Sequence, residues 1–81
     1  MSGSAHTREY KLFRELLRTT RIEAGLTQVD VARSMGRPQS YVSKYETGER
    51  RLDVVELLAV CAALQLPVTR FVKRLETRLR R

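Results

Sequence analysis

Four polar side chains between residues 39 and 44 are spaced so that they share one face of a helix. They are Gln39, Ser40, Ser43 and Lys44, at positions i, i+1, i+4 and i+5. The Gln39 amide can donate and accept at once, which suits N6 and N7 of adenine, and the Lys44 ammonium suits O6 and N7 of guanine. The stripe therefore has the chemistry to contact base edges. The same residue types are also common on any solvated helix, so the interpretation depends on their surroundings.

Catalytic and metal-binding groups are scarce in the chain. It has one histidine, His6, and one cysteine, Cys61, whereas a structural zinc site takes four Cys or His ligands. Cys61 lies in an apolar segment without a histidine partner, so we expect a buried, unreactive thiol. No phosphate-cradling GxxxxGK[ST] motif occurs. We therefore predict that the chain is not an enzyme and uses no metal, cofactor or small-molecule substrate.

The charge balance favours a polyanionic partner. Sixteen Lys and Arg residues against nine Asp and Glu residues give a formal net charge of +7. Most of the basic residues are arginine, whose guanidinium binds phosphate and guanine in a bidentate manner. Nucleic acid and an anionic membrane surface both fit this charge. Because no apolar run approaches the roughly 20 residues of a spanning helix and no export signal is visible, we expect a cytoplasmic protein with no membrane partner.

Apolar periodicity, with glycines between the periodic segments, predicts an all-α chain. The expected helices cover about residues 8–24, 27–35, 38–47, 53–64 and 68–79. Gly25 and Gly36 follow the first two, as glycines at helix ends do. No strand pattern occurs. Residues 8–81 should form one compact five-helix domain, and residues 1–7 a disordered tail or an expression-tag remnant.

Two of these helices carry clear start signals. Thr27 followed by Asp30, and Asp53 followed by Glu56, have the spacing of capping boxes. Behind Asp53 the chain is apolar on almost every side, which predicts a helix at the centre of the core. The segment 39–47 begins after Pro38, which suits a first helical turn but offers no side-chain cap.

With these elements in place, residues 25–66 resemble the phage-repressor helix-turn-helix family, also called the Cro/C1-type or XRE family. The shared features are Thr27-Gln28, Ala32, the turn glycine Gly36, the core position Val42 and the Tyr45-Glu46-x-Gly48 ending. The family commonly has Ser or Thr where this chain has Pro38. The resemblance implies a compact five-helix Cro/C1-type helix-turn-helix domain in which residues 39–47 enter the major groove of DNA.

The resemblance also implies roles for individual residues. Gln39, Ser40, Ser43 and Lys44 take the positions that contact bases. Arg21 and Glu46 match an internal ion pair that positions the recognition helix. Phosphate contacts are implied for Thr27, Gln28, Arg37, Tyr41, Arg50 and Arg51. The family often dimerises through its C-terminal helices, so a homodimer interface is expected at Phe71, Val72, Leu75 and Leu79. The alternative is a monomer in which these four residues pack inward on the helices expected at residues 8–24 and 53–64.

We therefore interpret the chain as a transcriptional regulator that binds a roughly palindromic operator in double-stranded DNA as a homodimer. It would resemble a phage Cro protein or the controller protein of a restriction–modification system. An antitoxin or adaptor on the same fold, with a protein as its main partner, is the alternative. RNA binding ranks lower because only Tyr41 among the residues expected to face outward can stack on a base. A membrane-surface role for residues 68–79 ranks below that.

Overall fold

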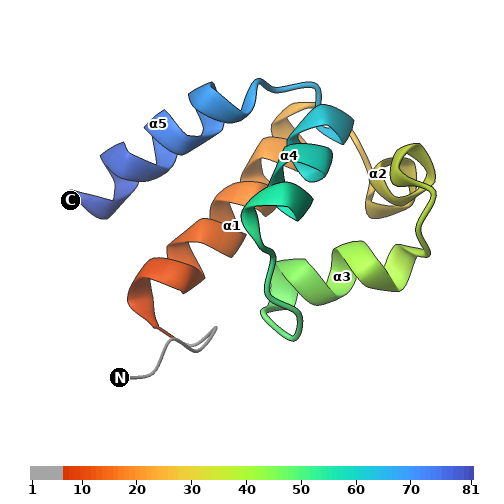
Figure 1. Cartoon of the computed structure of the whole chain (residues 1–81), viewed down its shortest axis with the longest axis horizontal. Coiled ribbons are helices and arrows are strands. Elements are labelled where there is room, and N and C mark those ends of the chain that lie inside the picture. The colour runs from red at the N-terminus through yellow and green to blue at the C-terminus, as the bar shows by residue number, and fades with distance from the viewer. Residues whose placement is uncertain (1–6) are drawn as a thin grey trace.

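The computed structural model describes residues 7–81, which fold into five helices (Figure 1). They are α1 (Arg8–Glu23), α2 (Gln28–Met35), α3 (Gln39–Thr47), α4 (Val54–Ala63) and α5 (Val68–Leu79). No strand occurs in this part of the chain. The all-α, five-helix prediction is confirmed, and each helix end lies within one residue of the expected position. The predicted tail up to residue 6, with His6, lies outside the described residues.

The packing order leaves α3 open on one side. α1 packs against α3 and α5, α2 against α3 and α4, and α4 against α5. In Figure 1, α3 and α5 lie at opposite sides of the molecule, with α1 and α4 between them. α5 therefore supports the core from the side away from α3 and leaves the outer face of α3 uncovered.

Three helices begin at side chains that bond their own first turn. The N–H of Asp30 donates to the Thr27 hydroxyl at 3.0 Å, and the Thr27 N–H donates to the Asp30 carboxylate at 2.8 Å. Asp53 and Glu56 make the same reciprocal pair at 2.7 and 2.9 Å. Thr7, expected in the tail, instead caps α1 by accepting the N–H of Tyr10 at 3.1 Å. These bonds satisfy N–H groups that the helix itself leaves unpaired.

The connection between α2 and α3 is short because Gly36 reverses the chain at once. Its φ of 66° and ψ of 33° lie in the left-handed region, where a residue with a β-carbon is strained. The N–H of Arg37 then returns to the carbonyl of Ala32 at 2.9 Å. This turn brings α3 directly against α2, which is the local geometry of a helix-turn-helix.

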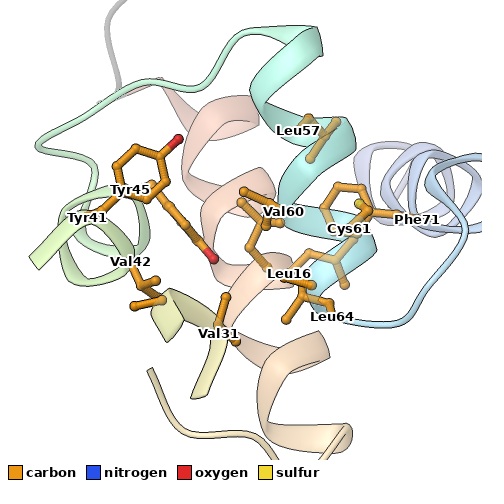
Figure 2. Close-up of a cluster of buried hydrophobic side chains, with 13 residues drawn as sticks. Leu16, Val31, Tyr41, Val42, Tyr45, Leu57, Val60, Cys61, Leu64 and Phe71 are labelled. Atoms are coloured by element: carbon orange, nitrogen blue, oxygen red, sulfur yellow. The ribbon is translucent and has the colours of Figure 1, made fainter. Parts of the chain in front are cut away.

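All five helices contribute to one core. Its largest fully enclosed side chains are Leu16, Leu17, Val31, Val42, Tyr45, Val60, Cys61 and Phe71. Figure 2 shows labelled members of this cluster converging from the five helices. Burial raises the pKa of the Cys61 thiol to about 11, so this thiol is protonated at neutral pH.

The expectation that α4 is buried on every side is wrong. Leu57, Val60 and Cys61 point into the core, but Val54 and Val55 are each 73% exposed and Leu58 is 48% exposed. α4 packs on α2 and α5, and none of the described helices covers its remaining face. An apolar composition all round therefore does not place this helix at the centre of the core.

Helix length and the placement of acidic, His and Cys side chains within residues 7–81 bear on membrane and metal binding. No single helix in this range is long and apolar enough to cross a membrane; only α4 and α5 taken together meet that test, and the pair is bent by 107°. The same range contains no cluster of three His, Cys, Asp or Glu side chains that could hold a metal ion.

Pro38 occupies the N-cap of α3 at φ −71° and ψ 156° and makes no side-chain cap bond. Serine fits this extended backbone, and its hydroxyl can accept an N–H of the first turn. We expect Pro38→Ser to exceed Pro38→Ala in free energy of unfolding by about 1 kcal/mol. The comparison with alanine cancels the effect of losing the rigid proline from the unfolded chain. Urea unfolding followed by circular dichroism measures the difference, and equal stabilities would contradict it.

Candidate nucleic-acid interface

Apart from Glu46, α3 presents its polar side chains to solvent, and it buries its apolar ones. Val42 and Tyr45 lie in the core. Gln39, Ser40 and Lys44 are exposed, and Ser43 is half-buried. The four residues singled out from their spacing therefore do lie along the open side of one helix.

A buried ion pair joins the end of α3 to α1. The Arg21 guanidinium contacts the Glu46 carboxylate through two bonds, from Nε to Oε2 at 2.7 Å and from Nη2 to Oε1 at 3.1 Å. Only 3% of the Glu46 side chain is exposed. The hydrogen bonds to Glu46 raise the pKa of Arg21, although burial acts in the opposite direction. Arg21 also donates to the carbonyl of Leu26 at 3.0 Å, which ties the loop before α2 to the same group.

A chain of side-chain hydrogen bonds runs from this ion pair to the surface of α3. Gln28 donates from Nε2 to the Glu46 Oε1 at 2.9 Å, and Gln39 donates from Nε2 to the Gln28 Oε1 at 3.0 Å. Gln28 therefore accepts from the exposed glutamine and donates to the buried carboxylate. This arrangement restricts the amide of Gln39 to one orientation. We refer to Arg21, Glu46, Gln28 and Gln39 as the relay.

Tyr41 lies in a different place from the one expected. The ring is only 7% exposed, so the prediction that it faces outward is wrong. The guanidinium groups of Arg37 and Arg50 lie over the ring, at 4.8 and 4.9 Å from its centroid. Tyr41 also packs edge-on against Tyr45. The ring therefore serves as a platform for two arginines, and its face is not free to stack on a base.

The loop between α3 and α4 holds its two arginines on neighbouring groups. Arg50 forms an ion pair with Glu56. The N–H of Asp53, and after it Arg50, lowers the pKa of the Glu56 carboxyl. Arg51 is exposed and lies over the Tyr10 ring at 4.2 Å, while the Tyr10 hydroxyl accepts the N–H of Leu52 at 3.1 Å. The loop is thus fixed by α1 on one side and by α4 on the other.

Sequence reasoning missed two supporting residues, Arg14 and Tyr10. Arg14 donates from Nη1 to the carbonyl of Glu46 at 3.0 Å. Its spacing of seven residues from Arg21 places it two turns earlier on the same face of α1, and that spacing was the available signal. The position of Tyr10 under the loop could not be found in this way, because the contact spans more than forty residues.

The net positive charge is carried by the two ends of the chain and not by the segment that contains the recognition helix. Residues 8–24 and 68–81 hold eleven basic and four acidic side chains, whereas residues 25–67 hold five of each. In the turn before α3, on α3 itself and in the loop after it, the basic groups are Arg37, Lys44, Arg50 and Arg51, and Arg50 is paired with Glu56. The interface is therefore locally basic within a segment that is neutral overall.

The α5 residues expected at a dimer interface differ in their accessibility. Phe71 is fully enclosed in the core, so its assignment to an interface is wrong. Val72 is 42% exposed. Leu75 and Leu79 are half-buried and line a groove of about 350 Å³ together with Phe13. Val72 is the only large apolar side chain of α5 that is exposed and could contact a partner.

Comparison with known proteins places this geometry in a family. A family model described as a helix-turn-helix domain matches residues 12–71. No curated protein sequence matches significantly.

Solved structures share the fold. An XRE-family like protein from Pseudomonas syringae pv. tomato str. DC3000 is 40% identical over 90% of this chain and 89% of its own, with a TM-score of 0.83. The wild-type restriction-modification controller protein C.Esp1396I is 21% identical over 94% of this chain and 100% of its own, with a TM-score of 0.86. The C.Esp1396I tetramer in complex with its natural 35-base-pair operator gives 21% identity, 94% and 100% coverage and a TM-score of 0.85. The domain match and the 40% identical relative show that this chain belongs to the Cro/C1-type (XRE) helix-turn-helix family.

Proposed function

We propose that this chain is a transcriptional regulator that binds double-stranded DNA in a sequence-specific manner, with α3 in the major groove. The observation that carries the proposal is Gln39, which is exposed on the first turn of α3 and held by Gln28. A base-contacting amide whose orientation is already restricted loses less conformational entropy on binding. Membership of a family of helix-turn-helix proteins supports the same function.

The stripe on α3 supplies the base contacts. Because Gln39 donates one N–H to Gln28, its Oε1 and its second N–H stay available as an acceptor and donor pair. Adenine presents the complementary pair at N6 and N7. Lys44 lies further along the same face for a guanine contact, with Ser40 and Ser43 between them.

Phosphate contacts flank the stripe on both sides. Thr27 and Gln28 lie at the start of α2, where free N–H groups and the helix dipole favour an anion. Arg37 and Arg50 lie over the Tyr41 ring, and Arg51 lies over the Tyr10 ring. Stacked guanidinium groups are preorganised, so less rotamer freedom is lost when they bind phosphate.

We further propose that the chain acts as a homodimer on a palindromic operator. A recognition helix of 9 residues contacts few base pairs. Two half-sites about one helical turn, or ~34 Å, apart multiply the discrimination of each. The structurally similar controller protein C.Esp1396I binds its natural operator as a tetramer, which supports an assembly of several subunits.

An antitoxin or adaptor with a protein partner is the second candidate function. The exposed apolar face of α4, with Val54, Val55 and Leu58, is the observation that favours it. The two functions differ in the role of α3, because an adaptor retains its activity when Lys44 or Gln39 is removed.

Selection from randomised DNA duplexes tests the leading proposal, and we expect a palindromic motif. Gln39→Ala should weaken binding to the selected site roughly 5- to 100-fold and relax the preference at one base pair, because a bidentate base contact contributes about 1–3 kcal/mol of discrimination. Arg51→Ala is the matched control. It should weaken binding to all sequences alike and lower the slope of log affinity against log salt by about one. Recovery of no motif would contradict a sequence-specific function.

Gln28→Ala interrupts the relay but leaves the Arg21–Glu46 ion pair in place. We expect the free energy of unfolding to fall by about 1–2 kcal/mol, as for two ordinary hydrogen bonds. The Kd for the selected operator should rise roughly tenfold, and the preference at the base pair contacted by Gln39 should weaken. A lost phosphate contact alone would instead weaken all sequences equally. DNA titration against single-base operator variants, with urea unfolding of the same protein, separates these effects.

Glu46→Gln differs from Gln28→Ala because it removes the ion pair itself and not only the hydrogen bonds to Gln28. It leaves Arg21 buried without its counter-charge, so the free energy of unfolding should fall by about 3–5 kcal/mol. If Gln28→Ala leaves both the Kd and the base preference unchanged, Gln39 does not depend on the relay.

A further inference from the structure

We propose that the outer face of α4 is the surface on which a second copy of this chain docks. The proposal rests on the proposed function, because it supplies the dimer that a palindromic operator requires. It moves the interface away from α5, where the sequence had suggested it.

The face is a continuous apolar stripe. We define the α4 stripe as Val54, Val55, Leu58, Ala59 and Ala62, which follow one another at i, i+1, i+4, i+5 and i+8 and are all exposed. The other exposed large apolar side chains, Ile22, Val29 and Val72, are single residues on three different helices. Within residues 7–81, only the α4 stripe brings several such side chains together on one helix.

The stripe forms a ridge between two hollows. On one side, a groove of about 350 Å³ includes Val54 and Leu57 and is closed by Phe13 of α1. On the other side, a groove of about 510 Å³ includes Val55 and Ala59 and reaches Met35 of α2. Helices pack by placing the ridge of one into the groove of the other. A surface that offers both can pair with itself about a two-fold axis, which is the symmetry of most homodimers.

Charge also favours a second copy at this position. Two protomers of net charge +7 repel one another over most of their surfaces. Residues 57–69 contain no charged side chain, and Glu56 beside the stripe is paired with Arg50. The charged side chains that line the two hollows are of both signs: Glu9, Arg51 and Asp53 on one side, and Arg37 and Glu56 on the other. The surroundings of the α4 stripe are therefore close to neutral, so two copies repel one another less here than over the rest of their surfaces.

The size of the stripe predicts a weak dimer. It exposes on the order of 300 Å² of apolar surface, the size at which a patch on a monomer is commonly functional. Pairing two such stripes with their rims gives an interface near or below the ~1,200 Å² limit of weak, transient complexes. We therefore expect a dissociation constant in the micromolar range.

The location of the stripe is compatible with two half-sites. α4 follows the basic loop at the end of α3, and neither Gln39 nor Lys44 lines either of the hollows beside the stripe. The longest extent of the protomer is 34 Å. A protomer of this size is comparable with the ~34 Å that separates two half-sites one DNA turn apart.

Charged substitutions at Val55 test the interface. Val55 is 73% exposed in the first turn of α4, so neither Val55→Glu nor Val55→Lys disturbs the core. Sedimentation velocity over a concentration series should show a dimer for the unaltered chain. Both Val55 variants should weaken self-association at least tenfold, because a two-fold interface buries the new charge twice. Val72→Glu is the matched control on α5 and should dimerise like the unaltered chain.

DNA binding separates this inference from the proposed function. On a duplex with one half-site, Val55→Glu and the unaltered chain should bind within a few-fold of each other. On the full operator, only the unaltered chain should bind cooperatively. Dimerisation of both Val55 variants at unaltered strength, loss of the dimer in Val72→Glu alone, or a monomer without cooperativity on the full operator would each overturn the α4 interface. Failure of the unaltered chain to bind any half-site would overturn the proposed function instead, since sedimentation tests the interface without DNA.

Discussion

The arrangement of the interface depends on the buried carboxylate of Glu46. Only 3% of this side chain is exposed, and a charge in that position must be paired and hydrogen-bonded, because an unpaired one costs several kcal/mol. Arg21 of α1 supplies the counter-charge, Gln28 of α2 supplies a further bond, and Arg14 of α1 bonds the Glu46 carbonyl. Directional contacts from two helices thus converge on the last turn of α3. Apolar packing alone tolerates small rotations, whereas this network permits one orientation of α3.

The helix bounds could be predicted closely because the signals for them are local. A capping box needs two residues three apart, and a left-handed turn needs one glycine, so Thr27 with Asp30 and Gly36 identify their elements without knowledge of the rest of the fold. The polar face of α3 followed from spacing in the same way. Exposure of α4 and burial of Tyr41 could not be predicted, since both depend on which distant segment covers a given face. Apolar side chains are more stable when they are buried, but they are buried only where another segment of the chain covers them.

The residues that would attract a polyanion at long range are mostly different from the residues that would recognise a base sequence. The excess of basic groups lies on α1, α5 and the residues after it, while the segment from residue 25 to residue 67 is neutral. Between exposed groups, a field of this kind is screened beyond about 8–10 Å at physiological salt. It favours an encounter with a polyanion and carries no information about sequence. In the turn before α3 and the loop after it, the three arginines Arg37, Arg50 and Arg51 lie over tyrosine rings, so their contacts depend on geometry more than on total charge.

The two stripes, polar on α3 and apolar on α4, are joined by a loop that the fold holds in place. Arg50 binds Glu56 across it, and Tyr10 binds its backbone at Leu52. The angle between α3 and α4 is therefore set within each protomer. If dimers form through α4, that angle also sets the distance between the two recognition helices, so an operator with altered spacing is rejected even when both half-sites match. A weak dimer adds a second consequence. Below its dissociation constant the dimer concentration varies with the square of the monomer concentration, so occupancy of a full operator changes steeply with the amount of protein.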